Sequence, residues 1–177
     1  LFSRMTTMEN LMLGRHIHMK TGVWRGSTFF RKGSGAAREE VAHREKVERI
    51  IDLLDLQSAR DKFVASLPYG TQKLVELGRA LAMEPALLLL DEPSAGMNSE
   101  EKQDLIFWIK DIQDELGVTL LVIEHDMKLV MDISDHVLAM NFGKPITEGS
   151  PAEVRKHPEV LKAYLGEEDI IDSVTPS

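Results

Sequence analysis

Residues 86–93, Ala-Leu-Leu-Leu-Leu-Asp-Glu-Pro, decide how this chain folds. The apolar run has the length of a buried strand that is covered on both faces, as in a parallel sheet. Pro93 cannot donate to a strand ladder, so we expect the strand to end before it. Asp91 and Glu92 would then lie at the carboxyl end of a parallel strand, where open α/β sheets bind ligands. One carboxylate suits Mg²⁺ and the other could polarise a water; the plainer alternative is an acidic turn.

Two further segments flank this strand. Upstream, Leu-Pro-Tyr-Gly-Thr-Gln at 67–72 precedes an amphipathic helical pattern over 72–83, so the sequence predicts a tight turn that opens into a helix. Such a turn points backbone N–H groups and the positive end of the helix dipole at an anion. Downstream, a second apolar run at 118–123 is followed by Glu-His-Asp at 124–126. If its strand neighbours the first, His125 lies at the same sheet edge as Asp91.

The remaining pattern predicts two parts and a tail. Residues 1–85 are expected to form a mostly helical subdomain, and residues 86–166, which alternate strand and helix, a parallel-sheet core. The acidic tail, 167–177, is expected to be disordered. Predicted helices cover 7–13 (capped by Thr6 and Glu9), 36–54 (with Val41, Val47, Ile50, Ile51 and Leu54 on its apolar face), 99–116 (capped by Asn98 or Ser99), 127–133, 152–156 and 158–165, with a hairpin of 137–140 and 145–148 and a basic loop at 15–35.

Composition excludes several classes of protein. The 177 residues are 43% hydrophobic and 28% charged, as in a soluble globular protein, and the net charge of −8 argues against non-specific nucleic-acid binding. With no cysteine, no disulfide framework is possible. No apolar stretch approaches the roughly 20 residues of a membrane helix. Because the chain opens with Leu1 in what reads as mid-domain sequence, we interpret it as a fragment.

Taken together, the order of turn, helix, strand-Asp-Glu, helix and strand-His resembles the ATP-binding cassette (ABC) ATPases over nearly the whole chain. The resemblance implies an α/β fold: a truncated P-loop NTPase fold with a parallel-sheet core plus a helical subdomain. It is strongest to the ATP-binding subunits of branched-chain amino acid importers. The segments that carry it are 5–11, 69–70, 95–98, 123–127, 149–154 and 163–166.

The resemblance assigns roles to individual residues, with ATP and Mg²⁺ as cofactors. Asp91 would help to hold Mg²⁺, Glu92 would be the general base of the Walker B site, and His125 would be the switch histidine. The signature, which acts on the partner's ATP, would be Pro68, Tyr69, Gly70, Thr71 and Gln72. The D-loop would be Ala95, Gly96, Met97 and Asn98.

Each motif has a plainer interpretation as an ordinary turn or loop. Pro68 departs from the family, which has a serine at this position; proline lacks both the hydroxyl and an N–H donor. Any phosphate contact would then rest on Gly70, Thr71 and the helix terminus.

The sequence contains no Gly-x-x-x-x-Gly-Lys-Ser/Thr motif, and Gly33-Ser34-Gly35 does not replace it. Such a loop supplies the nest of N–H groups and the lysine that hold the phosphates. In the family, this loop and the glutamine loop precede the region that the chain matches. We therefore expect the chain by itself neither to bind ATP appreciably nor to hydrolyse it, although the intact protein should do both. Exposed strand edges should also favour self-association.

Three functions stay open at this point. The first is an importer ATPase that pairs head-to-tail with a second ATPase subunit and docks on integral membrane permeases. It would be cytoplasmic and peripheral at the inner face of the membrane, with no span of its own and no nucleic-acid partner. The second is an ABC-type ATPase outside transport, which predicts long insertions or a basic face. The third is a non-catalytic interaction domain, supported by Pro68 and the missing phosphate loop.

Overall fold

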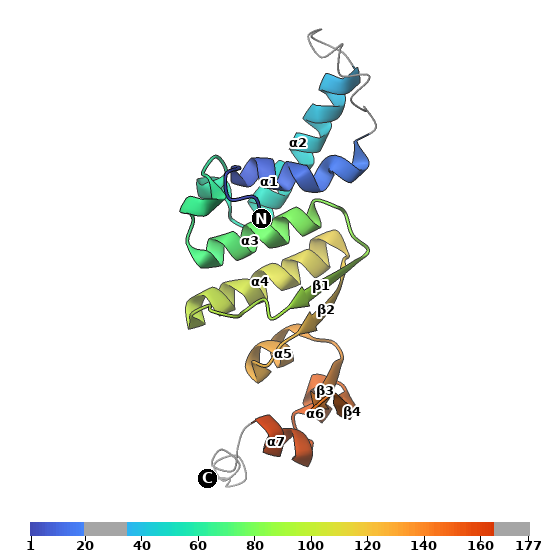
Figure 1. The fold of residues 1–177 in the computed structure, drawn as a ribbon. Coiled ribbons are helices and arrows are strands. Elements are labelled where there is room, and N and C mark those ends of the chain that lie inside the picture. Colours follow the sequence, from blue (N-terminus) through green and yellow to red (C-terminus); the bar gives the residue numbers. More distant parts are fainter. Residues whose placement is uncertain (20–34, 165–177) are drawn as a thin grey trace. The chain divides into compact units, whose positions relative to one another are not determined.

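The computed structural model describes residues 1–19 and 35–164 (Figure 1). The contacts divide the chain into two compact units, between residues 122 and 123. The predicted helical subdomain of 1–85 and core of 86–166 stay a prediction. The predicted tail of 167–177 lies outside the described residues. No helix within the described ranges is long and apolar enough to cross a bilayer.

The first helix, α1 (Thr7–Gly14), begins as the sequence predicts. The Thr6 hydroxyl accepts the Glu9 N–H at 3.2 Å, and Glu9 Oε2 accepts the Thr6 N–H at 2.7 Å. The two bonds form a capping box, which satisfies backbone donors that a helix start leaves unpaired. The residues that follow were predicted to be irregular, but Arg15–His18 form a 3₁₀ helix, η1. The rest of that predicted loop lies almost entirely outside the described residues.

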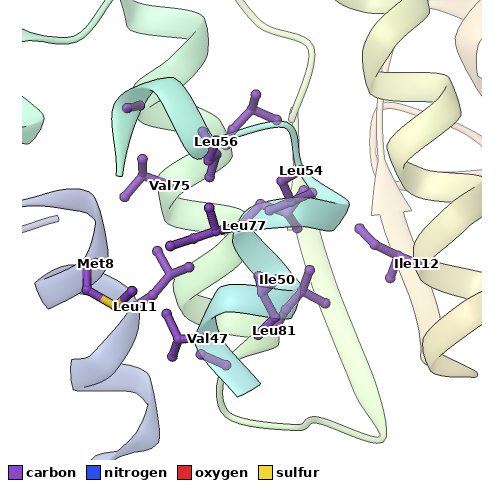
Figure 2. Packing of buried hydrophobic residues seen from close by; sticks show 14 of the residues in the cluster. Met8, Leu11, Val47, Ile50, Leu54, Leu56, Val75, Leu77, Leu81 and Ile112 are labelled. Carbon is purple, nitrogen blue, oxygen red and sulfur yellow. The ribbon is translucent and has the colours of Figure 1, made fainter. Parts of the chain in front are cut away.

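The core of the first unit lies between α1, α2 (Gly35–Leu53) and α3 (Tyr69–Leu81), as Figure 2 shows. Short 3₁₀ helices, η3 (Gln57–Ala59) and η4 (Val64–Ser66), join α2 to α3. The predicted apolar face of α2 is correct except for Val41, which is 56% exposed. Val41 lies in the early turns of α2, which extend past the helices that cover its later turns (Figure 1).

Two parallel strands, β1 (Leu87–Asp91) and β2 (Thr119–Ile123), are hydrogen-bonded neighbours. The prediction that β1 is buried on both faces is wrong. Leu88 is buried and Leu90 packs against the core, but Leu87 and Leu89 are 53% and 65% exposed. Leu121 of β2 is also more than half exposed. Among the described residues, side chains of the first unit cover one face of this sheet and leave the other open.

Between the two strands runs α4 (Ser99–Leu116), which has the predicted ends. Asn98 is the N-cap, and Gly117 closes the helix in the left-handed conformation at φ 61°. Glycine adopts this conformation without the steric cost that a β-carbon brings. The spacing predicts a buried face of Leu105, Ile106, Trp108, Ile109 and Ile112; all of these are buried except Trp108, which is partly buried and packs against the core.

The second unit contains α5 (Met127–Ile133), the antiparallel pair β3 (Val137–Asn141) and β4 (Lys144–Gly149), α6 (Pro151–Val154) and α7 (Pro158–Tyr164). The predicted hairpin is therefore confirmed. Its two turn residues, Phe142 and Gly143, both have positive φ, as a tight hairpin turn requires. A small core of Ala139, Val154 and Val160 holds this unit together.

Candidate functional site

The acidic strand end is built as the sequence predicts. Asp91 is the last residue of β1, and Glu92 adopts a left-handed backbone at φ 45°. In a regular strand, adjacent side chains point to opposite faces of the sheet. The left-handed residue ends that alternation before Pro93, and the Ala95 N–H then donates to the Glu92 carbonyl at 3.1 Å. The strand therefore passes at once into a tight turn that carries two adjacent carboxylates.

The predicted D-loop continues this turn to the start of α4. Ser94 is 2% exposed, and its carbonyl accepts the Met97 N–H at 3.1 Å. Gly96 has a φ of 79°, a region that side chains rarely adopt. Asn98 ends the loop and caps α4: its Oδ1 accepts the N–H groups of Glu100 and Glu101 at 2.9 and 3.0 Å. The loop is thus an ordered connector fixed at both ends.

The predicted signature forms the first turn of α3. Pro68 is the N-cap, and no side chain caps this end. The Pro68 carbonyl accepts the Gln72 N–H at 3.0 Å, and Gln72 Nε2 donates to the Leu67 carbonyl at 2.9 Å. The helix begins at Tyr69, earlier than the predicted Gln72, because Pro68 has the non-helical backbone of an N-cap directly before it.

The structure brings the signature and the D-loop together. A β-carbon built on Gly96 would lie 3.2 Å from Cε1 of Tyr69. A β-carbon built on Gly70 would lie 2.7 Å from Oε1 of Glu101. The first pair joins two predicted site segments. The second involves Glu101, an acidic residue in the first turn of α4 that was not among the predicted site residues.

His125 belongs to the second unit, so its predicted closeness to Asp91 stays a prediction. Its side chain is exposed and its backbone N–H donates to Glu124 Oε2 at 3.1 Å. The Glu124 side chain is fully buried, and its Oε2 lies 3.9 Å from His125 Nδ1. Sequence reasoning did not assign a role to Glu124. Its only signal was its position next to the histidine.

Asp91 is the residue predicted to bind Mg²⁺. Among the described residues, no three His, Cys, Asp or Glu side chains gather as a ready-made metal site. Mg²⁺ is commonly held by one or two carboxylates, with phosphate oxygens of a nucleotide and waters as its other ligands. The exposed carboxylate of Asp91 at the strand end fits that kind of shared site.

Comparison with known families decides what these segments belong to. The family model described as "ABC transporter" matches residues 1–95, more than half of the chain. The chain belongs to the ABC transporter family. A second model, for the branched-chain amino acid ATP-binding cassette transporter, matches residues 144–170.

Curated relatives agree with this family. The chain is 40% identical to the high-affinity branched-chain amino acid transport ATP-binding protein BraF of Pseudomonas aeruginosa and 39% identical to LivG of Salmonella typhimurium, a protein of the same description. Both matches cover 94% of this chain and 64% of the relative. The ABC transporter chain thus spans a little under two thirds of the length of these relatives.

A solved structure confirms the fold. The ADP conformation of an ATP-binding cassette of an ABC transporter matches with a TM-score of 0.70 and 30% identity. The match covers 93% of this chain and 64% of that one. The predicted class, an α/β P-loop NTPase fold of the ABC ATPase type, is therefore confirmed.

Proposed function

We propose that this family member is part of an ATPase subunit that powers import of branched-chain or related amino acids. The main observation in its support is that the signature turn of α3 lies against the D-loop. The D-loop in turn follows directly from the end of β1 at Asp91 and Glu92. The named function of BraF and LivG supports the substrate class. The assignment of the substrate class rests on these relatives.

The proposed chemistry is ATP hydrolysis, with the roles that the family resemblance implies. Asp91 would help to hold Mg²⁺, which supplies charge stabilisation at the phosphates. Glu92 would accept the proton of the attacking water, and His125 would contact the γ-phosphate. Two adjacent carboxylates can divide the metal and base roles because the left-handed Glu92 leaves the strand direction of Asp91.

Two kinds of partner are part of the proposal. The signature residues 68–72 and D-loop residues 95–98 would act on the ATP of a second ATPase subunit in a head-to-tail dimer. Integral membrane permease subunits would form the transport path. The protein would then be cytoplasmic and peripheral at the inner face of the membrane.

The decisive experiment replaces Glu92 by glutamine in the full-length protein. Removing a general base costs about 10²–10⁴-fold in rate, so we expect ATP turnover to fall by at least about 100-fold. ATP binding should persist, because glutamine keeps the size of the side chain. Glu100→Gln, a change in the exposed first turn of α4, is the matched control and should leave turnover unchanged. Equal turnover in Glu92→Gln and wild type would contradict the assignment of the base.

A second experiment concerns the 177-residue chain by itself. Because its sequence has no phosphate-binding loop, we expect no ATP·Mg²⁺ binding at micromolar concentrations in a calorimetric titration. Binding in that range would show that these residues hold nucleotide by other means.

One observation favours a second candidate, a non-catalytic interaction domain. Pro68 removes a hydroxyl from the signature turn, and no side chain caps that helix end. If the full-length protein binds no ATP, with or without the Glu92 change, this candidate replaces the ATPase.

A further inference from the structure

We propose that Glu101 is a positioning residue that fixes the D-loop (residues 95–98) to the signature turn (residues 68–72) of the same chain. This inference rests on the proposed function only for the statement that the two segments act on ATP. The contact itself lies within the first unit of this chain.

One carboxylate oxygen of Glu101 is held by the D-loop. Glu101 Oε2 accepts the Asn98 N–H at 2.8 Å, while Asn98 Oδ1 accepts the Glu101 N–H at 3.0 Å. This reciprocal pair is a capping box. It fixes the rotamer of Glu101 relative to the last residue of the D-loop.

The other carboxylate oxygen lies against the signature turn. A β-carbon on Gly70 would come within 2.7 Å of Glu101 Oε1 and 3.3 Å of its Cδ. Gly70 is the second residue of α3, and its backbone does not need a positive φ. Alanine is the better helix former, so helix geometry alone does not call for glycine here. A β-carbon at this position would instead have to displace the Glu101 carboxyl group, whose Oε2 is bonded to Asn98.

A second contact joins the D-loop directly to the signature turn, at Tyr69, the residue before Gly70. The ring of Tyr69 lies where a β-carbon on Gly96 would make a 3.2 Å contact, and Gly96 has a positive φ of 79°. The D-loop thus contributes a glycine that admits Tyr69 of the signature turn. The signature turn contributes a glycine that admits Glu101, the α4 residue bonded to Asn98 at the end of the D-loop. The two contacts therefore place the D-loop directly against the signature turn.

The contact can be tested by thermal unfolding of the 177-residue chain. Gly70→Ala should push the Glu101 carboxylate away from Asn98 and lower the melting temperature by about 2–4 °C. In a Glu101→Ala background the obstacle is gone, and Gly70→Ala should leave the melting temperature unchanged or raise it. Glu100→Ala is the control background and should not rescue Gly70→Ala. Equal effects of Gly70→Ala in all three backgrounds would overturn the proposal, because the contact would then carry no coupling energy.

The functional consequence is measured in the full-length protein. Glu101→Ala should lower kcat for ATP by about 10–100-fold, since small displacements of positioned groups have effects of that size. Glu101→Gln keeps an oxygen that can accept the Asn98 N–H and should restore most of kcat. Glu100→Ala should leave kcat unchanged.

The outcomes separate the two proposals. If wild type hydrolyses ATP but Glu101→Ala matches Glu100→Ala, the positioning role is wrong and the ATPase assignment stands. If Glu101→Gln is as slow as Glu101→Ala, charge rather than the capping bond matters, and the positioning role again fails. If wild type does not hydrolyse ATP, the proposed function fails, while the unfolding experiment still decides the contact.

Discussion

Helices α4 and α3 begin in opposite ways. Asn98 and Glu101 close the start of α4 with a capping box, and boxes of the same kind start α1 and α6. In contrast, α3 starts at Pro68, with no side-chain cap and no acidic residue in its first turn. The first N–H groups of a helix need a partner from outside the helix. The chain supplies such a partner at α4 from its own side chains. At α3 the described residues supply no side-chain cap, and the Glu101 carboxylate that lies against this turn is held by Asn98 instead.

Removing the cap of α4 should give the largest stability change. Asn98→Ala deletes the acceptor of two N–H groups, and loss of such a cap costs about 1–2 kcal/mol of unfolding free energy. Urea unfolding of the 177-residue chain measures it. Ser99→Ala, one residue on and without a capping bond in the structure, should change little. Equal losses of unfolding free energy for the two variants would mean that the capping box does not stabilise the start of α4.

The substitution Pro68→Ser adds a hydroxyl at the N-cap of α3 and so tests whether this helix start can gain a side-chain cap. A serine cap stabilises the folded chain by about 1 kcal/mol. Loss of proline raises the conformational entropy of the unfolded chain, which lowers stability by about 0.4–1 kcal/mol. Pro68→Ser should therefore barely change the free energy of unfolding. If the new hydroxyl and N–H reach a phosphate, a charge-assisted bond of about 1.5 kcal/mol would lower the ATP concentration at half-maximal hydrolysis about tenfold. The assay uses the full-length protein.

Pro68→Ala separates the two groups that serine adds. It restores the N–H without the hydroxyl, so it should show only part of the gain in ATP affinity. If serine and alanine are alike, the hydroxyl makes no contact with the phosphate.

The smallest effect is expected at the capping box of α6. The Ser150 hydroxyl, and then its backbone N–H, donate to Glu153 and lower the pKa of that carboxyl. A lowered pKa means that the cap stabilises the fold fully above the ordinary pKa of glutamate and loses this contribution as pH falls through the lowered value. An NMR titration of Glu153 measures the pKa. Ser150→Ala removes the first donor and should raise it; an unchanged pKa would show that the hydroxyl is not the main cause.

Sequence reasoning succeeded where the cause is local. The cap at Thr6, the cap of α4 and the end of β1 depend on residues within a few positions of one another. The first and the last appear as predicted, and the cap of α4 is Asn98, one of the two residues predicted for it. It failed where coverage by distant elements decides. The outward leucines of β1 and Val41 of α2 are apolar by sequence, but no pattern says whether anything lies over them.

Part of the candidate site was equally out of reach. The contact of Glu101 with Gly70 joins helices that are separate in sequence. Glu101 also had a sufficient local explanation, because an acidic residue in the first turn of a helix is favourable by itself. A side chain with one evident role gives no sequence signal of a second one.

The open face of the β1–β2 sheet, with Leu87, Leu89 and Leu121, has a practical consequence for every comparison of variants. Exposed apolar strands tend to associate with other copies of the chain. Association that occurs only in the folded state raises the apparent melting temperature as protein concentration rises. Differences of a few degrees between variants therefore have meaning only at matched concentrations, extrapolated from a dilution series.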